Sequence, residues 1–99
     1  MKYVISWELR PAVTEADAAR SLEVFSKWSP SEGADFKEFL SRVDGRGGFA
    51  VVEVDDVALI AKDVAPFGAW FDFTVQPVLE IADATAIQMG AIEFLASVS

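Results

Sequence analysis

Glu53 is the side chain in this sequence best placed for acid–base chemistry. It ends an apolar segment, residues 49–54, and the alternation of a strand puts it on the same face as Phe49 and Val51. A carboxylate among apolar neighbours has a raised pKa and acts as a general acid or base near neutral pH. Arg42 would then stabilise developing negative charge. Two structural alternatives stay open: an ion pair between Glu53 and Arg42, and a solvated strand end.

Aromatic side chains form a second group of candidates, because small-molecule sites are mostly apolar with few polar groups. Packing in a core or a dimer interface is the alternative role, since aromatic residues dominate both. Trp28 and Trp70 lie at the ends of expected elements, where they would either fill the gap between helix and sheet or gate an entrance to it. The candidate ligand-binding residues are Trp7, Trp28, Phe49, Trp70, Phe71 and Phe73.

Several kinds of catalytic site are excluded by composition. The sequence has no histidine and no cysteine, so it cannot form a Ser-His-Asp triad, a thiolate metal site or a cysteine nucleophile. Asp55 and Asp56 stand side by side before an expected helix, which is typical of an N-cap that also complements the helix dipole. No further ligands follow at a recognisable spacing, and we therefore expect neither a metal nor a cofactor.

The charge pattern argues against nucleic acid and membrane partners. The formal net charge is −8, and the eight Lys and Arg residues are scattered along the chain rather than clustered. Binding to phosphates needs such a cluster. The longest apolar run is far shorter than the ~20 residues of a membrane span. The first residues acquire a charge too early for a secretory signal, and we expect a cytoplasmic protein.

The amount of apolar sequence points to a partner subunit. Hydrophobic residues make up 53% of 99 residues, and we expect a single domain over residues 1–99. A domain this small has much surface for its volume, so an apolar excess usually marks an interface or a pocket. Residues 49–54 are apolar on both sides, as in a strand covered on both faces. We therefore predict a homodimer.

Periodicity and turn residues divide the chain into seven elements. Expected strands cover residues 3–9, 35–43, 49–54 and 71–81, and the third of these would be a buried strand. Residues 35–43 also allow a helical turn at their start. Pro77 predicts an edge position or a bulge in the last strand. Expected helices run from Thr14 to Trp28 with a capping box to Asp17, from Asp55 or Asp56 to Pro66, and from Asp83 onwards. The last helix has an inward stripe of Ala84, Ile87, Ala91, Phe94 and Leu95.

This order predicts an α+β fold of the ferredoxin-like βαββαβ kind, followed by an extra C-terminal helix. Right-handed crossovers place the first two helices on one face of a four-stranded antiparallel sheet. The other face stays open, and it would be partly apolar. Two such faces stacked against each other would cover both, which gives a dimeric α/β barrel.

Three short patterns resemble a known family. They are Val-x-x-Trp at residues 4–7, Gly-Phe-Ala-x-Val-Glu at residues 48–53 leading into two aspartates, and Phe-x-Val-x-Pro-Val-Leu at residues 73–79. Together they resemble a family of short bacterial proteins of unknown function, similar to a branch of the dimeric α/β-barrel group. That group includes cofactor-free monooxygenases, polyketide-processing enzymes and stress-response proteins. The resemblance implies a homodimer with a pocket between sheet and helices, and it identifies no catalytic residue.

Two functional hypotheses follow from the residues and the resemblance. The first is a non-enzymatic homodimer, structural or ligand-binding, that holds a small apolar molecule between sheet and helices. The second is a cofactor-independent enzyme, monooxygenase- or cyclase-like, that acts on a polyketide-like ring with Glu53 as acid or base and Arg42 as the charge-stabilising group. The absence of the usual catalytic residue types favours the first.

Overall fold

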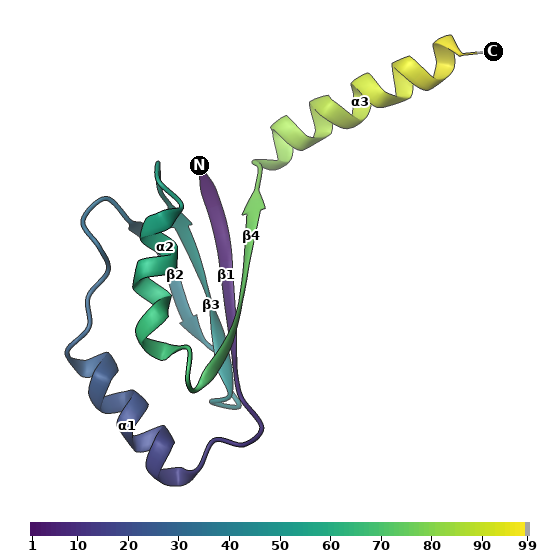
Figure 1. Ribbon diagram of the computed structural model, residues 1–99. Coiled ribbons are helices and arrows are strands. Elements are labelled where there is room, and N and C mark those ends of the chain that lie inside the picture. The colour runs from purple at the N-terminus through teal and green to yellow at the C-terminus, as the bar shows by residue number, and fades with distance from the viewer. Residues whose placement is uncertain (99) are drawn as a thin grey trace.

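Residues 1–98 of the chain, described by a computed structural model, form a four-stranded sheet with helices (Figure 1). The order is the predicted βαββαβ pattern followed by a C-terminal helix, and the α+β prediction is confirmed. The elements are β1 (Lys2–Leu9), α1 (Glu15–Ser26), β2 (Asp35–Ser41), β3 (Gly47–Glu53), α2 (Ala58–Val64), the short 3-10 helix η1 (Ala65–Phe67), β4 (Phe71–Val78) and α3 (Ile81–Ser97).

The sheet is antiparallel throughout, with the strand order β2-β3-β1-β4. The two central strands place Ile5 of β1 directly opposite Ala50 of β3, and Val75 of β4 lies opposite Ile5 on the other side. β4 is an edge strand, as Pro77 predicted, because an edge tolerates a residue without a backbone donor.

A β-bulge in β2 explains why the sequence there resembled a helical turn. The register against β3 shifts between Phe36 and Glu38, and the segment is strand from Asp35 onwards. One extra residue reverses the alternation of faces. Phe36 pairs with Val52 and Phe39 pairs with Ala50, so both rings point to the same side of the sheet. Their helix-like spacing of three is therefore produced by a bulged strand.

A capping box fixes the start of the first helix, whereas α2 follows Val57, whose side chain makes no cap bond. Thr14 and Asp17 form the predicted capping box: the Asp17 amide donates to the Thr14 hydroxyl oxygen at 3.1 Å, and the Thr14 amide donates to the Asp17 carboxylate at 3.2 Å. At the second helix, the Ala58 amide donates to the Asp56 carboxylate at 3.0 Å. Of the two predicted candidates, Asp56 therefore satisfies the first turn of α2.

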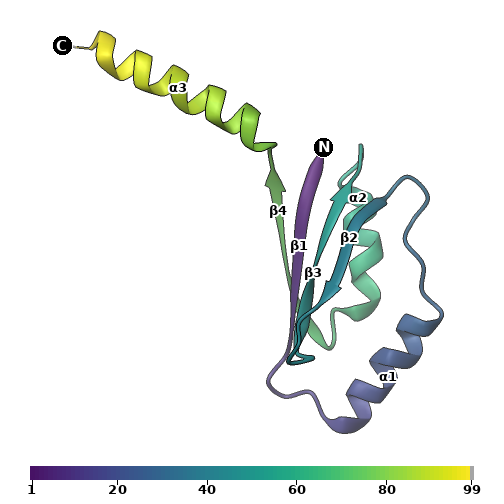
Figure 2. The ribbon, with the colours of Figure 1, turned by 180° about the vertical axis from the view of Figure 1, so that it is seen from behind.

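The core lies between the central strands and α2. Its buried residues are Ile5, Ala50, Val52, Val54 and Ile60. Val52 is completely buried, which agrees with the prediction that β3 is an interior strand. Both α1 and α2 lie on this side of the sheet, and the other side remains open (Figures 1 and 2).

Two glycines at the start of β3 allow an unusually close approach of β1. A Cβ atom on Gly47 would lie 2.0 Å from the carbonyl oxygen of Trp7, and one on Gly48 would lie 2.2 Å from that of Leu40 and 2.5 Å from the Trp7 ring. Positive φ in the turn before β3 belongs to Gly45, with φ of 73°, and not to these two glycines. Gly48 instead leaves the room in which the Trp7 indole lies.

Asp63 ties the loop after α1 to α2. Its carboxylate is buried and accepts hydrogen bonds from the Ser31 amide at 3.0 Å and the Ser31 hydroxyl at 2.6 Å. The carbonyl oxygen of Asp63 accepts a bond from the Trp28 indole nitrogen at 3.0 Å. These bonds hold the C-terminal end of α1 at a fixed distance from the sheet.

The last helix departs from the predictions. β4 ends at Val78, three residues earlier than expected, and α3 begins at Ile81 rather than Asp83. No residue of α3 is buried, so the predicted inward stripe faces no surface of its own chain. The helix extends beyond the end of β4, away from the sheet (Figures 1 and 2), and the molecule measures 62 × 30 × 21 Å. Among residues 1–98, no helix combines the length and hydrophobicity needed to cross a membrane.

A substitution that adds one methyl group tests the close approach of β1 and β3. We expect Gly48→Ala to lower the free energy of unfolding by about 1–3 kcal/mol, because its Cβ meets backbone and an indole ring that cannot both move away. Urea denaturation followed by circular dichroism measures this loss. Gly90→Ala is the matched control, since nothing lies within 4 Å of its added Cβ and alanine favours a helix. Equal unfolding midpoints for the two variants would contradict the packing argument.

Removal of the Asp63 carboxylate tests the hydrogen bonds that join α2 to the loop after α1. We expect Asp63→Ala to cost about 1–3 kcal/mol of unfolding free energy, because the Ser31 amide loses its partner in a partly buried place. Asp55→Ala serves as the control at an exposed aspartate nearby. Chemical denaturation of both variants gives the comparison, and a loss no larger in Asp63→Ala than in the control would refute the role of these bonds.

Candidate functional site

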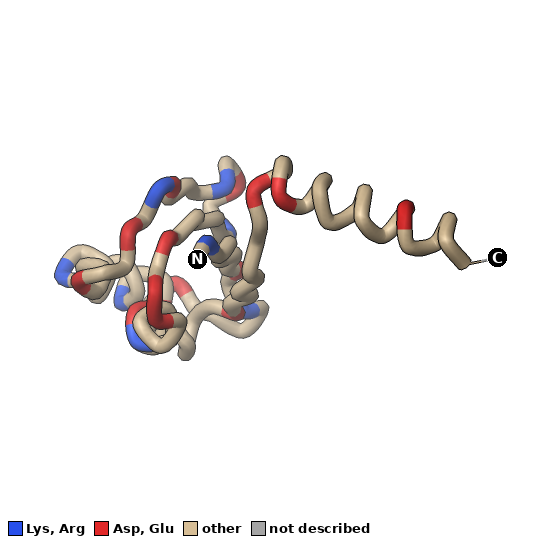
Figure 3. Tube along the Cα trace, turned by 90° about the horizontal axis from the view of Figure 1, so that it is seen from above, with Lys and Arg blue, Asp and Glu red and all other residues tan. Residues whose placement is uncertain are grey.

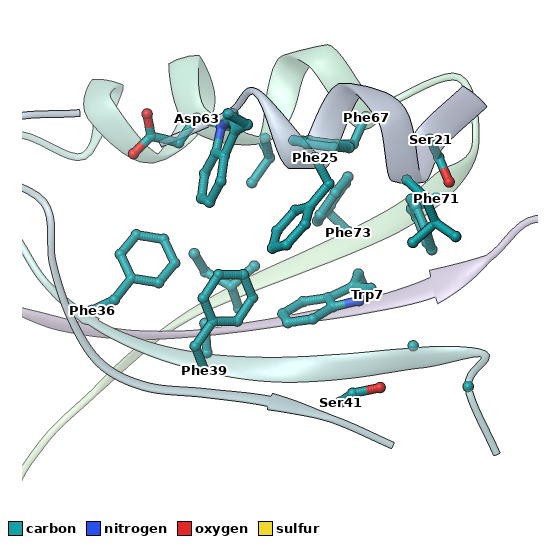
Figure 4. A pocket seen from close by; sticks show the side chains of 17 residues that line it. Trp7, Ser21, Phe25, Phe36, Phe39, Ser41, Asp63, Phe67, Phe71 and Phe73 are labelled. Atoms are coloured by element: carbon teal, nitrogen blue, oxygen red, sulfur yellow. The ribbon is translucent and has the colours of Figure 1, made fainter. Parts of the chain in front are cut away.

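An open cleft of about 490 Å³ lies between the sheet and the two helices that cover it. Strand residues form its floor, and residues of α1, α2 and η1 form its roof (Figure 4). Most of its lining is aromatic or aliphatic. The lining residues that carry the argument are Trp7, Phe25, Trp28, Phe36, Phe39, Phe67, Phe71 and Phe73, all aromatic.

The aromatic rings contact one another across the cleft. On the floor, Phe39 lies 5.5 Å from Trp7 in an edge-to-face arrangement and 5.2 Å from Phe36. From the roof, the Phe25 ring lies 5.9 Å from that of Phe39, and the Trp28 ring lies 5.8 Å from that of Phe67. Such distances and tilts are those that aromatic pairs prefer. The rings therefore form a continuous wall rather than isolated apolar spots.

Differences in side-chain size along the floor create this space. The central strand β3 presents only Gly48, Ala50 and Val52 to the cleft side, whereas its neighbours present large rings. Phe39 lies opposite Ala50, and Trp7 lies opposite Gly48. A low centre with tall aromatic borders leaves a hollow. α1 does not fill the hollow, since Leu22 and Phe25 remain 70% and 48% exposed.

The serine and aspartate side chains along the cleft already have hydrogen-bond partners. The Ser21 hydroxyl donates to the carbonyl oxygen of Ala18 at 2.7 Å, and the Ser41 hydroxyl donates to that of Arg42 at 3.1 Å. The Asp63 carboxylate is engaged by Ser31, as described above. The cleft therefore has the chemistry to enclose an apolar molecule, with little capacity to bind a charged one.

The structure brings four of the six predicted ligand-binding residues together in the cleft: Trp7, Trp28, Phe71 and Phe73. Phe49 lies on the opposite face of the sheet, because it alternates with Gly48 and Ala50 along β3. Trp70 precedes β4, where its carbonyl oxygen accepts a hydrogen bond from the Arg10 amide at 2.9 Å, and it does not line the cleft.

Four further aromatic residues of the cleft were not predicted as site residues: Phe25, Phe36, Phe39 and Phe67. Phe25 recurs at helical spacing with Ala18 and Leu22, which is a usable signal for the inner side of the first helix. Phe36 and Phe39 were obscured by the bulge between them. Nothing in the sequence near Phe67 distinguished it, since its place depends on the 3-10 turn that continues α2.

Glu53 lies on the open face of the sheet, away from the cleft. Its Cα is opposite that of Lys2, and one carboxylate oxygen lies 3.3 Å from the amino group of Met1. The other carboxylate oxygen is shielded from solvent and has no hydrogen-bond partner within residues 1–98. The candidate acid or base and the aromatic cleft are therefore on opposite sides of one sheet.

Arg42 lies at the other end of the strands from Glu53, and the ion pair suggested between them is not formed. The Arg42 guanidinium instead contacts the carboxylates of Glu8 at 3.2 Å and Asp44 at 2.5 Å. The hydrogen bond to Glu8 and then that to Asp44 raise the pKa of Arg42. The amide of Arg46 and then the Arg42 side chain lower the pKa of Asp44. This group of charges fixes the turn between β2 and β3.

Within residues 1–98, no three carboxylates gather as they would around a metal ion. Comparison with known proteins gave no match among curated proteins and none among solved structures. The wider grouping with dimeric α/β barrels therefore stays a prediction. A family of sequences does match residues 1–92, which is nearly the whole chain. The chain belongs to the DUF3303 family, which is described as a domain of unknown function.

Proposed function

We propose that the protein binds a small, uncharged, aromatic or otherwise apolar molecule in the cleft between the sheet and helices α1 and α2, and that it does so as a homodimer. The observation that carries the first part is the cleft itself. Its volume of about 490 Å³ falls within the roughly 300–1,000 Å³ of ligand pockets. Eight aromatic side chains line it.

The composition of the cleft defines the class of ligand. Its serines and its aspartate are already hydrogen-bonded, so a charged or strongly polar ligand would lose its hydration without compensation. The net charge of −8 adds repulsion for anionic ligands. Rings that meet edge to face offer both faces and edges to a flat guest molecule. A neutral aromatic molecule therefore fits best.

The homodimer is supported by apolar surface outside the cleft. On the open face of the sheet, Leu40 and Phe49 are 55% and 49% exposed. They are neighbours across β2 and β3, so they form a patch rather than isolated residues. Contiguous exposed apolar patches usually mark interaction sites.

The enzyme hypothesis gains no support from the arrangement of residues. Glu53 and the cleft lie on opposite faces of the sheet, and Arg42 is engaged by two other carboxylates. A general acid must reach the reacting atom within hydrogen-bond distance. A substrate held in the cleft would be separated from Glu53 by the sheet, and the binding function is therefore the one we propose.

Calorimetric titration with three neutral probes, naphthalene, 1-naphthol and indole, tests the binding function. We expect at least one probe to bind and to raise the unfolding temperature, since a ligand of the folded state stabilises it. Phe39→Ala should weaken binding by about tenfold. The substitution removes a ring from the floor of the cleft, and the contact of such a ring with an aromatic ligand contributes about 1 kcal/mol or more to binding.

Phe49→Ala is the matched control for this titration. Phe39 and Phe49 are exposed to similar extents, 44% and 49%, and lie on neighbouring strands, but only Phe39 faces the cleft. The control should bind the probe as the wild type does even if its dimer is weakened, because all residues that line the cleft come from one copy. The proposal fails if none of the three probes binds, or if the two variants weaken binding equally.

A further inference from the structure

α3 presents a broad apolar surface that nothing in its own chain covers. Its large apolar residues are all exposed, from Met89 at 53% to Ile81 at 80%. A helix that is apolar around most of its circumference is normally buried. The arc that we call the apolar arc of α3 consists of Ile81, Ala84, Ile87, Ala91, Ile92, Phe94 and Leu95, with the uncharged Gln88 among them.

A narrow strip of small and acidic residues, which we call the polar strip, runs along another side of α3. Asp83, Ala86, Gly90, Glu93 and Ser97 recur at alternating spacings of three and four, which places them on one side of the helix. Asp83 and Glu93 are the only charged residues of α3, and the helix has no Lys or Arg (Figure 3). A helix that binds a membrane surface usually carries basic residues on its polar side. The composition of α3 therefore favours a protein surface.

The open face of the sheet offers a second uncovered apolar surface. Val4, Leu40, Phe49 and Val51 are neighbours there by the strand register, and we call them the sheet patch. α3 has seventeen residues and is about 25 Å long, which is close to the length of the strands that it would cross. One helix is thus enough to cover the patch.

The exit of α3 from the sheet keeps these two surfaces apart within one molecule. Only Leu79 and Glu80 separate β4 from α3. The Glu80 carboxylate forms an ion pair with Lys2 on β1, and this hydrogen bond raises the pKa of Lys2 and lowers that of Glu80. Since the linker is short and held at the end of the sheet, α3 projects outward and not back over its own open face (Figure 2).

The charges around the sheet patch favour a helix as its cover over a second sheet. Glu8, Glu38, Glu53 and Asp72 border the patch on the same face. Glu8 is paired with Arg42, Asp72 with Arg10 and Glu53 with the amino group of Met1, whereas the exposed Glu38 has no ion pair within residues 1–98. Two such faces stacked directly would bring these charged borders and the Glu38 carboxylates against each other. The apolar arc of α3 carries no charge; Glu93 lies on the opposite side of the helix, and Asp83 lies at the edge of the arc, one turn before Ile87.

We propose that two copies of this chain exchange their C-terminal helices, so that the apolar arc of each α3 lies on the sheet patch of the other copy. The exchange rests on the homodimer of the proposed function and names the surfaces that hold it. Such a contact is isologous, since each copy gives one helix and receives one, and it closes at two copies. It leaves the aromatic cleft free, because the cleft is on the other side of the sheet.

Sedimentation equilibrium of the full chain tests the role of α3. Wild type should be a dimer at micromolar concentration. The double variant Ile87→Glu with Leu95→Glu should raise the dimer dissociation constant by about a hundredfold or more, since two central apolar contacts become charges. Ala86→Glu with Ser97→Glu is the control, because it adds the same charge to the polar strip of the same helix. Circular dichroism of each variant checks that the helix is retained.

Cross-linking tests the receiving surface. The chain has no cysteine, so single thiols can be introduced without background. Copies with Ile92→Cys, mixed with copies with Phe49→Cys and oxidised, should give a disulfide-linked pair. Copies with Ala86→Cys in place of Ile92→Cys should give much less, because that residue lies on the polar strip.

The possible results separate this inference from the proposed function. A monomeric wild type would overturn the homodimer and the exchange together, without bearing on ligand binding in the cleft. A wild-type dimer that is unaffected by the double variant would overturn the exchange and leave the homodimer standing. Loss of dimer in the double variant without the cross-link to Phe49→Cys would overturn the sheet patch as the receiving surface.

Discussion

The close approach of β1 and β3 at Gly47 and Gly48 is the constraint on which the rest of the structure depends. No Cβ atom fits at either position, because the carbonyl of Trp7 or of Leu40 already occupies the space. Because Gly48 has no side chain, the Trp7 indole lies close over β3 and forms part of the floor of the cleft. The two residues that follow on the same face, Ala50 and Val52, are also small and are buried. This run of small side chains makes the centre of the sheet low.

The cleft exists because the roof is held away from this low floor. Asp63 connects α2 to the loop after α1 through Ser31, and its carbonyl receives the Trp28 indole. The end of α1 is thus fixed to α2 rather than to the sheet. A helix packed directly on the floor would bury Leu22 and Phe25, but both stay largely exposed. Such exposure is unfavourable in water, and a bound apolar molecule would reduce it.

Apolar surface remains uncovered in three separate places: the cleft, the open face of the sheet and α3. A sequence that is 53% hydrophobic accounts for this excess, because a body of this size cannot enclose so many apolar groups. The radius of gyration is 17.8 Å, whereas about 13 Å is expected for a compact chain of about 100 residues. The difference comes from α3, which packs on no other element. The cleft faces away from the open face of the sheet and from α3. A small molecule in the cleft and a second copy of the chain on the other two surfaces can therefore be bound at once.

The sequence by itself determined the order of the elements, the capping box of the first helix and the identity of the interior strand. Local signals suffice for these features: Thr14 and Asp17 are three residues apart, Pro77 lacks a donor, and residues 49–54 are apolar on both sides. Sequence also identified half of the aromatic cleft, including Trp7 and Phe73.

Only the tertiary structure decided which face each candidate occupies. The bulge in β2 brought Phe36 and Phe39 to one side, and strict alternation in β3 sent Phe49 and Glu53 to the other. The periodicity of α3 indicates that the helix needs a partner surface. It does not show that its own chain offers no such surface, because the direction of the helix depends on the two residues that connect it to the sheet. A one-residue change of register moves a side chain to the other face of a sheet, and the amino-acid composition gives no information about the register.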